Sequence, residues 1–256
     1  ISKEFLKRQC LDITELVFSG IFRTGKSQNK KEKMRAAKRL ETVSLCSFER
    51  LVMNELLKAE HLSVSFFTDA GEVEAVRDVS FTVEKGEVLA IVGESGCGKS
   101  ALCKSIMKLL PKTAKIKSGK ILVNGADITD YTEKNMSRLR GELFSMVFQD
   151  PMTSLNPTIT VGKQIGEAVR IHNKKMSRGQ IRKRVIELMQ LVEIDRPEER
   201  IRQYPHEFSG GMRQRAVMAI ALAGNPKILF ADEPTTALDV TIQAQILDVF
   251  RRIQKK

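Results

Sequence analysis

Residues 59–150 alternate short apolar runs with turn residues, a pattern typical of alternating strands and helices. Val88–Val92 is continuous, apolar and β-branched at several positions, so it predicts a strand buried on both faces. Apolar residues then recur at helical spacing up to Pro111, where the predicted helix ends; they are Leu102, Ile106 and Leu109. Ile121–Val123 followed by Asn124-Gly125 predicts a hairpin.

The remainder of the chain is largely helical. Apolar positions repeat at helical spacing through residues 161–194, and a second helix is predicted from Met212 to Ala223 with Ser209 as its N-cap. This second helix is apolar nearly all round, so we expect it to be buried. Strands are predicted before these helices at Phe144–Phe148 and after them at Ile228–Ala231.

A glycine-rich loop stands between the predicted strand 88–92 and the helix that follows it. Its residues have the spacing G-x-x-x-x-G-K-S: Gly93, Glu94, Ser95, Gly96, Cys97, Gly98, Lys99 and Ser100. The backbone N–H groups of such a loop converge on an anion, and the positive end of the next helix points at it. Lys99 can reach the outer phosphates, and the Ser100 hydroxyl can coordinate Mg²⁺. The sequence therefore predicts a phosphate-binding loop. A second match at 20–27 is poorer in glycine, and we interpret it as coincidence.

Two carboxylates follow the predicted strand Ile228–Ala231. Asp232 is placed to hold Mg²⁺ through water, and Glu233 to orient and deprotonate an attacking water. Buried carboxylates without a partner are costly, so we expect a cation beside them. Gln149 follows the strand 144–148, and a glutamine at a strand end can contact both Mg²⁺ and the attacking water.

A second anion site is predicted where Ser209, Gly210 and Gly211 open the helix at 212–223, because N–H groups are free at a helix N-terminus. One chain then has two phosphate-type sites but one pair of catalytic carboxylates. The economical explanation is a dimer, in which each chain's second site caps the nucleotide of its partner. The alternative is a glycine-rich N-cap without a ligand.

Charge distinguishes the N-terminal stretch from the rest. The net charge is +12, and residues 1–58, with a helical pattern at 32–45, contain 13 Lys or Arg against 7 Asp or Glu. We interpret this stretch as a solvated helical face, with attraction to anionic lipid or nucleic acid as the alternative. The basic run 30–39 contains no aromatic residue, which gives base stacking little support.

Composition narrows the class of protein further. None of the four cysteines (Cys10, Cys46, Cys97 and Cys103) forms a Cys-x-x-Cys pair, and no histidine cluster accompanies them, so we expect no zinc site and a reducing cytosol. No uninterrupted apolar run reaches the ~18 residues of a membrane-spanning helix.

Together, the motifs resemble those of ABC transporter ATPases over roughly residues 57–256. The resemblance rests on their order along the chain: the loop 93–100, Gln149, Phe208–Met212, Ile228–Pro234 and the turn Ala237-Leu238-Asp239. The stretches 147–157 and 204–212 are similar to the dipeptide and oligopeptide importer branch of that family.

The resemblance implies an α/β fold, a P-loop NTPase core with a helical subdomain, incomplete at the C-terminus. It implies four segments: a basic helical N-terminal segment at 1–56, the first part of the nucleotide-binding core at 57–150, the helical subdomain with its signature loop at 151–222, and the second part of the core at 223–256.

The resemblance also assigns roles, with ATP and Mg²⁺ as the cofactors. Residues 93–100 and Ala101 bind the nucleotide, and Phe67, or alternatively Phe66, stacks on adenine unless it belongs to the core. Ser209, Gly210 and Gly211 contact the γ-phosphate bound by the partner. The Mg²⁺ ligands are Ser100, Gln149 and Asp232, and the catalytic residues are Glu233, as general base, and Gln149, whose loop links hydrolysis to the membrane subunit.

The implied partners are a second ABC ATPase subunit, identical or not, integral membrane permease subunits and, indirectly, a peptide-binding protein, at the cytoplasmic face of the cell membrane. No specific nucleic acid is expected. The family's switch histidine would lie beyond Lys256, and His206 is no substitute, so we expect this chain to bind nucleotide better than it hydrolyses it. The alternatives are a catalytically impaired nucleotide-binding fragment and a soluble ABC ATPase acting on nucleic acid.

Overall fold

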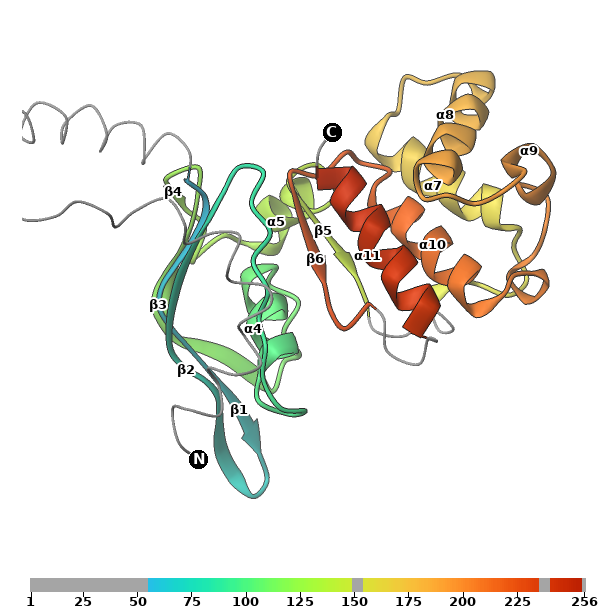
Figure 1. Cartoon of the computed structure of the whole chain (residues 1–256). Helices are drawn as coiled ribbons and strands as arrows, with labels where there is room; N and C mark the ends of the chain where they lie inside the picture. Colours follow the sequence, from blue (N-terminus) through green and yellow to red (C-terminus); the bar gives the residue numbers. More distant parts are fainter. Residues whose placement is uncertain (1–54, 149–153, 235–239, 255–256) are drawn as a thin grey trace, which may run out of the picture. The chain divides into compact units, whose positions relative to one another are not determined.

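The computed structural model describes residues 55–148, 154–234 and 240–254, all within a unit formed by residues 51–256 (Figure 1). The helical pattern at 32–45, the second glycine-loop match at 20–27, Gln149 and the turn 237–239 lie outside the described residues. Among the helices that are described, none combines the length and the apolar character needed to cross a membrane.

An antiparallel sheet is formed by β1 (Glu55–Thr68), β2 (Gly71–Glu84), β3 (Ala114–Val123) and β4 (Ala126–Asp127), in the order β2-β1-β3-β4. The hairpin predicted at 121–125 is confirmed as the β3–β4 turn, in which Asn124 and Gly125 have φ values of 47° and 78°. Both residues adopt the left-handed conformation that a two-residue hairpin turn requires.

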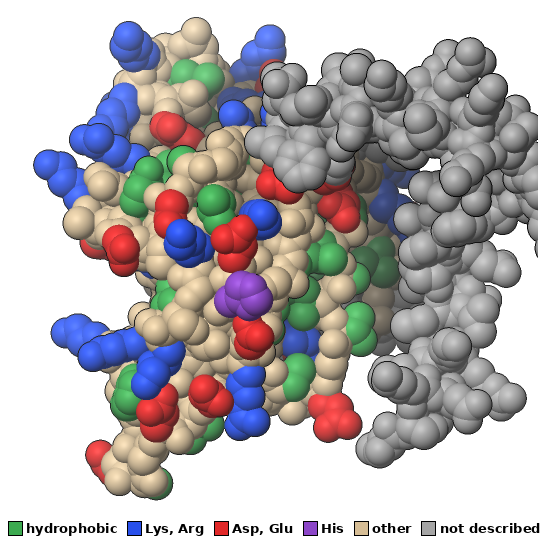
Figure 2. All heavy atoms as spheres, turned by 90° about the vertical axis from the view of Figure 1, so that its left-hand side faces the viewer, with side chains coloured by type: hydrophobic (Ala, Val, Ile, Leu, Met, Phe, Trp, Pro, Cys, Tyr) green, Lys and Arg blue, Asp and Glu red, His purple; other side chains and the backbone are tan. Residues whose placement is uncertain are grey.

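The long β1–β2 hairpin is a feature that the sequence did not indicate. Buried positions are frequent along β1, whereas β2 is largely exposed, so β2 has no clear apolar alternation. Figure 2 shows that acidic and basic side chains intermix over the face of the molecule that these strands present. Strand pairing along β1 holds β2 in place where its own apolar pattern is weak.

A second sheet is parallel and joins β5 (Phe144–Val147) to β6 (Ile228–Ala231), which pair residue by residue from Phe144 with Ile228 to Val147 with Ala231. Both predicted strands are confirmed, β5 ending one residue earlier than expected because Phe148 is already outside the ladder. The carboxyl ends of parallel strands lie at the same edge, which places the residue after Ala231 beside Val147. The Asp232 N–H accordingly donates to the Val147 carbonyl at 3.0 Å.

The prediction of a buried strand at Val88–Val92 was wrong. The run is irregular in the structure, and the exposed fractions of Val88 and Val92 are 70% and 91%. A strand needs neighbours whose N–H and C=O groups complete its ladder. In the described part of the chain, β5 and β6 form a two-stranded sheet with one isolated bridge from Phe144 to Arg140, and no strand lies alongside 88–92. β-branched composition alone therefore did not produce a strand here.

The helix after the glycine-rich loop is confirmed as α4 (Lys99–Ile106), with Leu102 and Ile106 buried. It ends before Leu109, earlier than the prediction, because Lys108 takes a left-handed conformation with φ 51°. Leu109 N–H then donates back to the Lys104 carbonyl at 2.8 Å, which closes the helix end. The short helix α5 (Glu133–Leu139) follows the β3–β4 hairpin.

The helical part contains α7 (Val161–His172), α8 (Arg178–Leu191), α9 (Pro197–Arg200), the 3₁₀ turn η1 (Pro205–Glu207), α10 (Gly210–Ala221) and α11 (Val240–Gln254). The predicted Ser209 N-cap is confirmed, since its hydroxyl accepts from the Met212 N–H, and α10 is mostly buried as expected. The pattern at 161–194 resolves into α7 and α8, the second opening with a capping box between Ser177 and Gln180.

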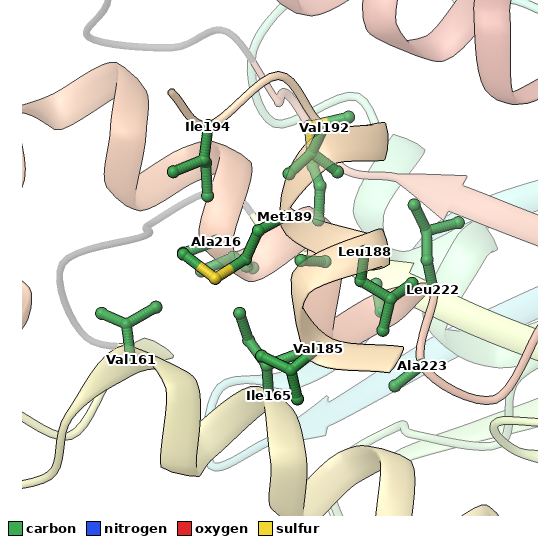
Figure 3. Close-up of a cluster of buried hydrophobic side chains, with 14 of the residues drawn as sticks. Val161, Ile165, Val185, Leu188, Met189, Val192, Ile194, Ala216, Leu222 and Ala223 are labelled. Atoms are coloured by element: carbon green, nitrogen blue, oxygen red, sulfur yellow. The ribbon is translucent and has the colours of Figure 1, made fainter. Parts of the chain in front are cut away.

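Two apolar clusters organise the described residues. One joins the antiparallel sheet to α4 and to the start of β5, where Phe144 is fully buried. The other joins α7, α8, α10 and α11. Figure 3 shows part of the latter, with Val161 and Ile165 of α7 facing Val185 and Met189 of α8. β5 supplies residues to both clusters, Met146 to the first and Val147 to the second, so the parallel pair lies where they meet.

Candidate nucleotide-binding site

The glycine-rich loop is exposed from Gly93 to Cys97 and leads directly into α4. Gly98 is the N-cap of that helix and has φ 96°, a left-handed conformation that favours glycine. A Cβ at Gly98 would lie 2.1 Å from the Ala75 carbonyl oxygen of β2. The loop thus passes too close to β2 for any side chain at this position. It leaves N–H groups of the loop and of the α4 N-terminus available for an anion.

The Lys99 ammonium is held by the loop's own carbonyls. Its Nζ donates to the carbonyl oxygens of Gly93 at 2.9 Å and Glu94 at 2.8 Å. These two hydrogen bonds fold the lysine back over the loop, whose centre is the place predicted for phosphate. An anion in the loop would compete for the same ammonium, since hydrogen bonds between ionised groups are the stronger ones.

The two predicted motifs are in contact with each other. The Ser100 hydroxyl donates to Asp232 Oδ1 at 2.6 Å, across 132 residues of sequence. Asp232 is 6% exposed, and in the described part of the chain it has no ion-pair partner. A buried carboxylate beside a hydroxyl is a set of hard oxygen donors of the kind that Mg²⁺ accepts. Ser100 and Asp232 therefore fit the divalent cation that the sequence predicted.

Glu233 follows Asp232 with φ 46°, so the backbone turns sharply at the end of β6. A non-glycine residue in this conformation is under strain, and such strain is concentrated at functional sites. The side chain is half-buried next to the buried Asp232. Its predicted role as general base remains a prediction.

Cys103 is a neighbour of this site that the sequence did not single out. Burial raises the pKa of its thiol to about 11, and the negative charge of Asp232 adds to the increase. The thiol lies one turn beyond Lys99 on α4. Because its pKa is raised, the thiol stays neutral beside the carboxylate. The signal available in the sequence was its spacing, since residues 99 and 103 share a face of one helix.

The remaining predicted residues are distributed over the described part of the chain. Ser209 and Gly210 are exposed at the start of α10, and no hydrogen bond or ion pair of the described residues joins them to the loop 93–100. Phe67 is 39% exposed, and its ring centroid lies 5.5 Å from Lys117 Nζ and 5.9 Å from Lys115 Nζ. Phe66 is half-buried, which makes Phe67 the more accessible of the two aromatic candidates.

A glycine-rich loop at a helix N-terminus, joined through a serine to a buried carboxylate at a strand end, defines the class of nucleotide-binding P-loop proteins. A family model described as ABC transporter matches residues 76–236. The chain therefore belongs to the ABC transporter family, and the fold class expected from the sequence is confirmed.

The curated relatives include the oligopeptide transport ATP-binding protein OppD of Bacillus subtilis (strain 168), 56% identical over 80% of this chain and 57% of its own length. The dipeptide transport ATP-binding protein DppD of the same organism is 58% identical over 80% of this chain and 61% of its own length. The chain thus spans about three fifths of these relatives. The resemblance to the peptide importer branch is confirmed at this level.

Solved structures similar to this chain include ABC cassettes. One is a dimeric post-hydrolysis state of the ATP-binding cassette MJ0796 bound to ADP and Pi, with a TM-score of 0.68, 26% identity and coverage of 78% of this chain and 83% of that one. Another is a dimeric structure of MJ0796 as a bacterial ABC transporter cassette, with a TM-score of 0.69 at the same identity and coverage.

Proposed function

We propose that this chain is the ATP-binding and ATP-hydrolysing part of a subunit that energises an importer of dipeptides or oligopeptides, at the cytoplasmic face of the membrane. The observation that carries the proposal is the hydrogen bond from Ser100 to Asp232, because it joins the phosphate loop to the strand-end carboxylates. The peptide-importer relatives support the choice of solute class.

Each of the site residues has a separate role in phosphoryl transfer. The N–H groups of Gly96–Ser100 and the α4 N-terminus hold the β- and γ-phosphates. Lys99 exchanges its two loop carbonyls for phosphate oxygens. Ser100 and Asp232, with Gln149, would hold Mg²⁺, which would supply positive charge to the transferring phosphoryl group. Glu233 accepts a proton from the attacking water, and Gln149 orients that water.

Ser209, Gly210 and Gly211 act on the nucleotide of a partner subunit. Their helix, α10, opens with Ser209 and Gly210 exposed and Gly211 buried, and no described contact brings it to the chain's own phosphate loop. A second subunit facing this one places α10 over the partner's γ-phosphate. The dimeric cassettes among the similar structures support this arrangement.

A basic cavity between α7 and α8 is the proposed seat of the membrane partner. Its volume is about 650 Å³, and five cations line it against one acid, Glu167; the cations are Lys163, Arg170, Arg178, Arg182 and Arg202. None of the five makes an ion pair within the described residues. Unpaired cations around apolar side chains fit an acidic segment of a permease, by charge complementarity.

Nucleotide binding and turnover test the catalytic part of the proposal. Lys99→Ala is expected to lower affinity for a fluorescent ATP analogue at least about tenfold, since it removes a charge-assisted contact. Glu233→Gln is expected to retain binding and to abolish the slow release of phosphate that is expected of the unchanged chain. Equal affinity of Lys99→Ala and the unchanged chain would contradict the proposal.

Co-purification tests the membrane partner. Arg178→Glu with Arg182→Glu reverses two cavity charges and is expected to abolish recovery of the chain with permease subunits from detergent-solubilised membranes. The matched control is Arg196→Glu, since Arg196 is an exposed cation outside the cavity. Recovery of the double variant at the level of the control would contradict the assignment of the cavity.

A further inference from the structure

The Arg215 guanidinium joins three separate elements of the helical part. Arg215 lies on α10, six residues after Ser209, and its side chain is 13% exposed. Nη1 donates to the Glu193 backbone carbonyl and lies 3.7 Å from the Glu193 carboxylate. Nη2 donates to Gln245 Oε1 of α11 at 3.0 Å. One planar fork thus fixes α10 against the end of α8 and against α11.

The Glu193 carboxylate extends this joint. It also pairs with Arg252 of α11, so α11 is held through two arginines. Glu193 itself has φ 60° in the turn after α8, a conformation that glycine adopts at lower cost. A charged residue at a position that favours glycine indicates that its side-chain contacts offset the cost of the backbone conformation.

The contacts of Arg215 and Glu193 connect two helices, α10 and α11, that begin beside different nucleotide sites. α10 begins at Ser209–Gly211, which act on the partner's nucleotide in the proposed function. α11 begins shortly after Asp232 and Glu233, which act on the chain's own nucleotide. Ile246 and Val249 of α11 also share the apolar cluster with Ala216 and Val217 of α10, so the polar joint lies beside a packed contact.

We infer that Arg215 is a positioning residue that sets the direction of the α10 N-terminus, Ser209–Gly211, relative to the chain's own carboxylates. The inference rests on the proposed function. Apolar packing between α10 and α11 allows the helices to slide, whereas a guanidinium fork with two acceptors and a carboxylate beside it fixes one orientation. Arg215 therefore governs the pairing of two subunits over ATP without touching the nucleotide.

The test separates pairing from nucleotide binding. All variants carry Glu233→Gln, which keeps bound ATP intact. Arg215→Lys retains the charge but loses the fork, and Gln245→Leu removes only the α11 acceptor. We expect both to bind a fluorescent ATP analogue within about twofold of the parent and to weaken Mg·ATP-driven dimerisation about tenfold or more, as the loss of a charge-assisted hydrogen bond implies. Dimerisation is measured by sedimentation velocity.

Arg251→Lys is the matched control, because Arg251 pairs with Asp248 within α11. Dimerisation of Arg215→Lys and Gln245→Leu equal to that of this control would overturn the inference. A parent that binds ATP but does not dimerise would contradict the proposed function instead. Hydrogen exchange then tests the positioning role of Arg215 without dimerisation. Faster exchange at the amides of 210–212 in both variants, with α8 unchanged, supports a positioning role for Arg215. Unchanged exchange at those amides overturns it.

Discussion

At the scale of single residues, the phosphate loop depends on backbone geometry more than on side chains. Gly98 and Gly96 both have positive φ, 96° and 80°, but their surroundings differ. A Cβ at Gly98 meets the Ala75 carbonyl, whereas a Cβ at Gly96 has nothing within 4 Å. A substitution at Gly98 therefore meets both a steric clash and an unfavourable backbone conformation, whereas one at Gly96 meets only the unfavourable conformation.

Gly98→Ala is expected to destabilise the fold by at least about 3 kcal/mol, because it adds a clash to backbone strain. Gly96→Ala adds strain alone and should cost about 1 kcal/mol. Urea unfolding measures both. Equal losses would show that the approach of the loop to β2 is looser than the structure indicates.

The cysteines provide a test of the local environment. Cys97 is exposed, whereas burial raises the pKa of Cys103 to about 11 from an ordinary value of 9.0. Iodoacetamide at pH 8 should therefore modify Cys97 and leave Cys103 intact, as read by peptide mass spectrometry, because only the thiolate reacts. Modification of both thiols at equal rates would contradict this.

The same shift makes stability depend on pH. The folded state holds the Cys103 proton more tightly than the unfolded state, so its contribution is fully present below pH 9 and is lost as pH rises toward 11. Cys103→Ala should flatten the fall in thermal midpoint across that window. A midpoint profile identical to that of the unchanged chain would contradict this assignment.

At the scale of elements, the C-terminus of α4 is held by a residue far along the chain. Arg140 donates to the carbonyls of Met107 at 3.1 Å and Lys108 at 2.9 Å, and it pairs with Glu133. A cation on the last carbonyls of a helix satisfies acceptors that the helix leaves open. Arg140 thereby fixes the helix that presents Lys99 and Ser100.

Arg140→Met should lower the free energy of unfolding by about 2 kcal/mol, because two partly buried carbonyls lose a charged donor. Glu133→Gln is the control, since it keeps both carbonyl bonds and alters only an exposed ion pair, which contributes little. Thermal unfolding compares the two. A larger effect of Glu133→Gln would place the stabilisation in the ion pair.

The elements also show what could be predicted from sequence and why the rest could not. β6, α4 and the Ser209 cap are determined by local pattern, and the structure confirms them. Val88–Val92 failed because a strand depends on neighbours that local pattern does not report. The β1–β2 hairpin was missed because β2 has no clear apolar alternation, and Arg140 because its partners lie 32 and 33 residues away.

At the scale of the whole molecule, the exposed run Val88–Val92 leaves apolar, β-branched residues facing solvent. Such a segment without a paired neighbour promotes association between chains. Val92→Lys should reduce concentration-dependent association in sedimentation velocity. Ile171→Lys, at an exposed apolar residue of α7 away from the run, should have little effect. Equal behaviour of the two variants would show that association has another source.

The contact between Ser100 and Asp232 also has a consequence for synthesis. The two residues are 132 positions apart, so a ribosome adding about 5–20 residues per second makes the loop roughly 10 s before the carboxylate that completes it. A nascent chain that has exposed only the loop offers half of a cation site. On the proposed function, we therefore expect tight nucleotide binding only once β6 has paired with β5, so that a bound nucleotide stabilises the finished domain and not the growing chain.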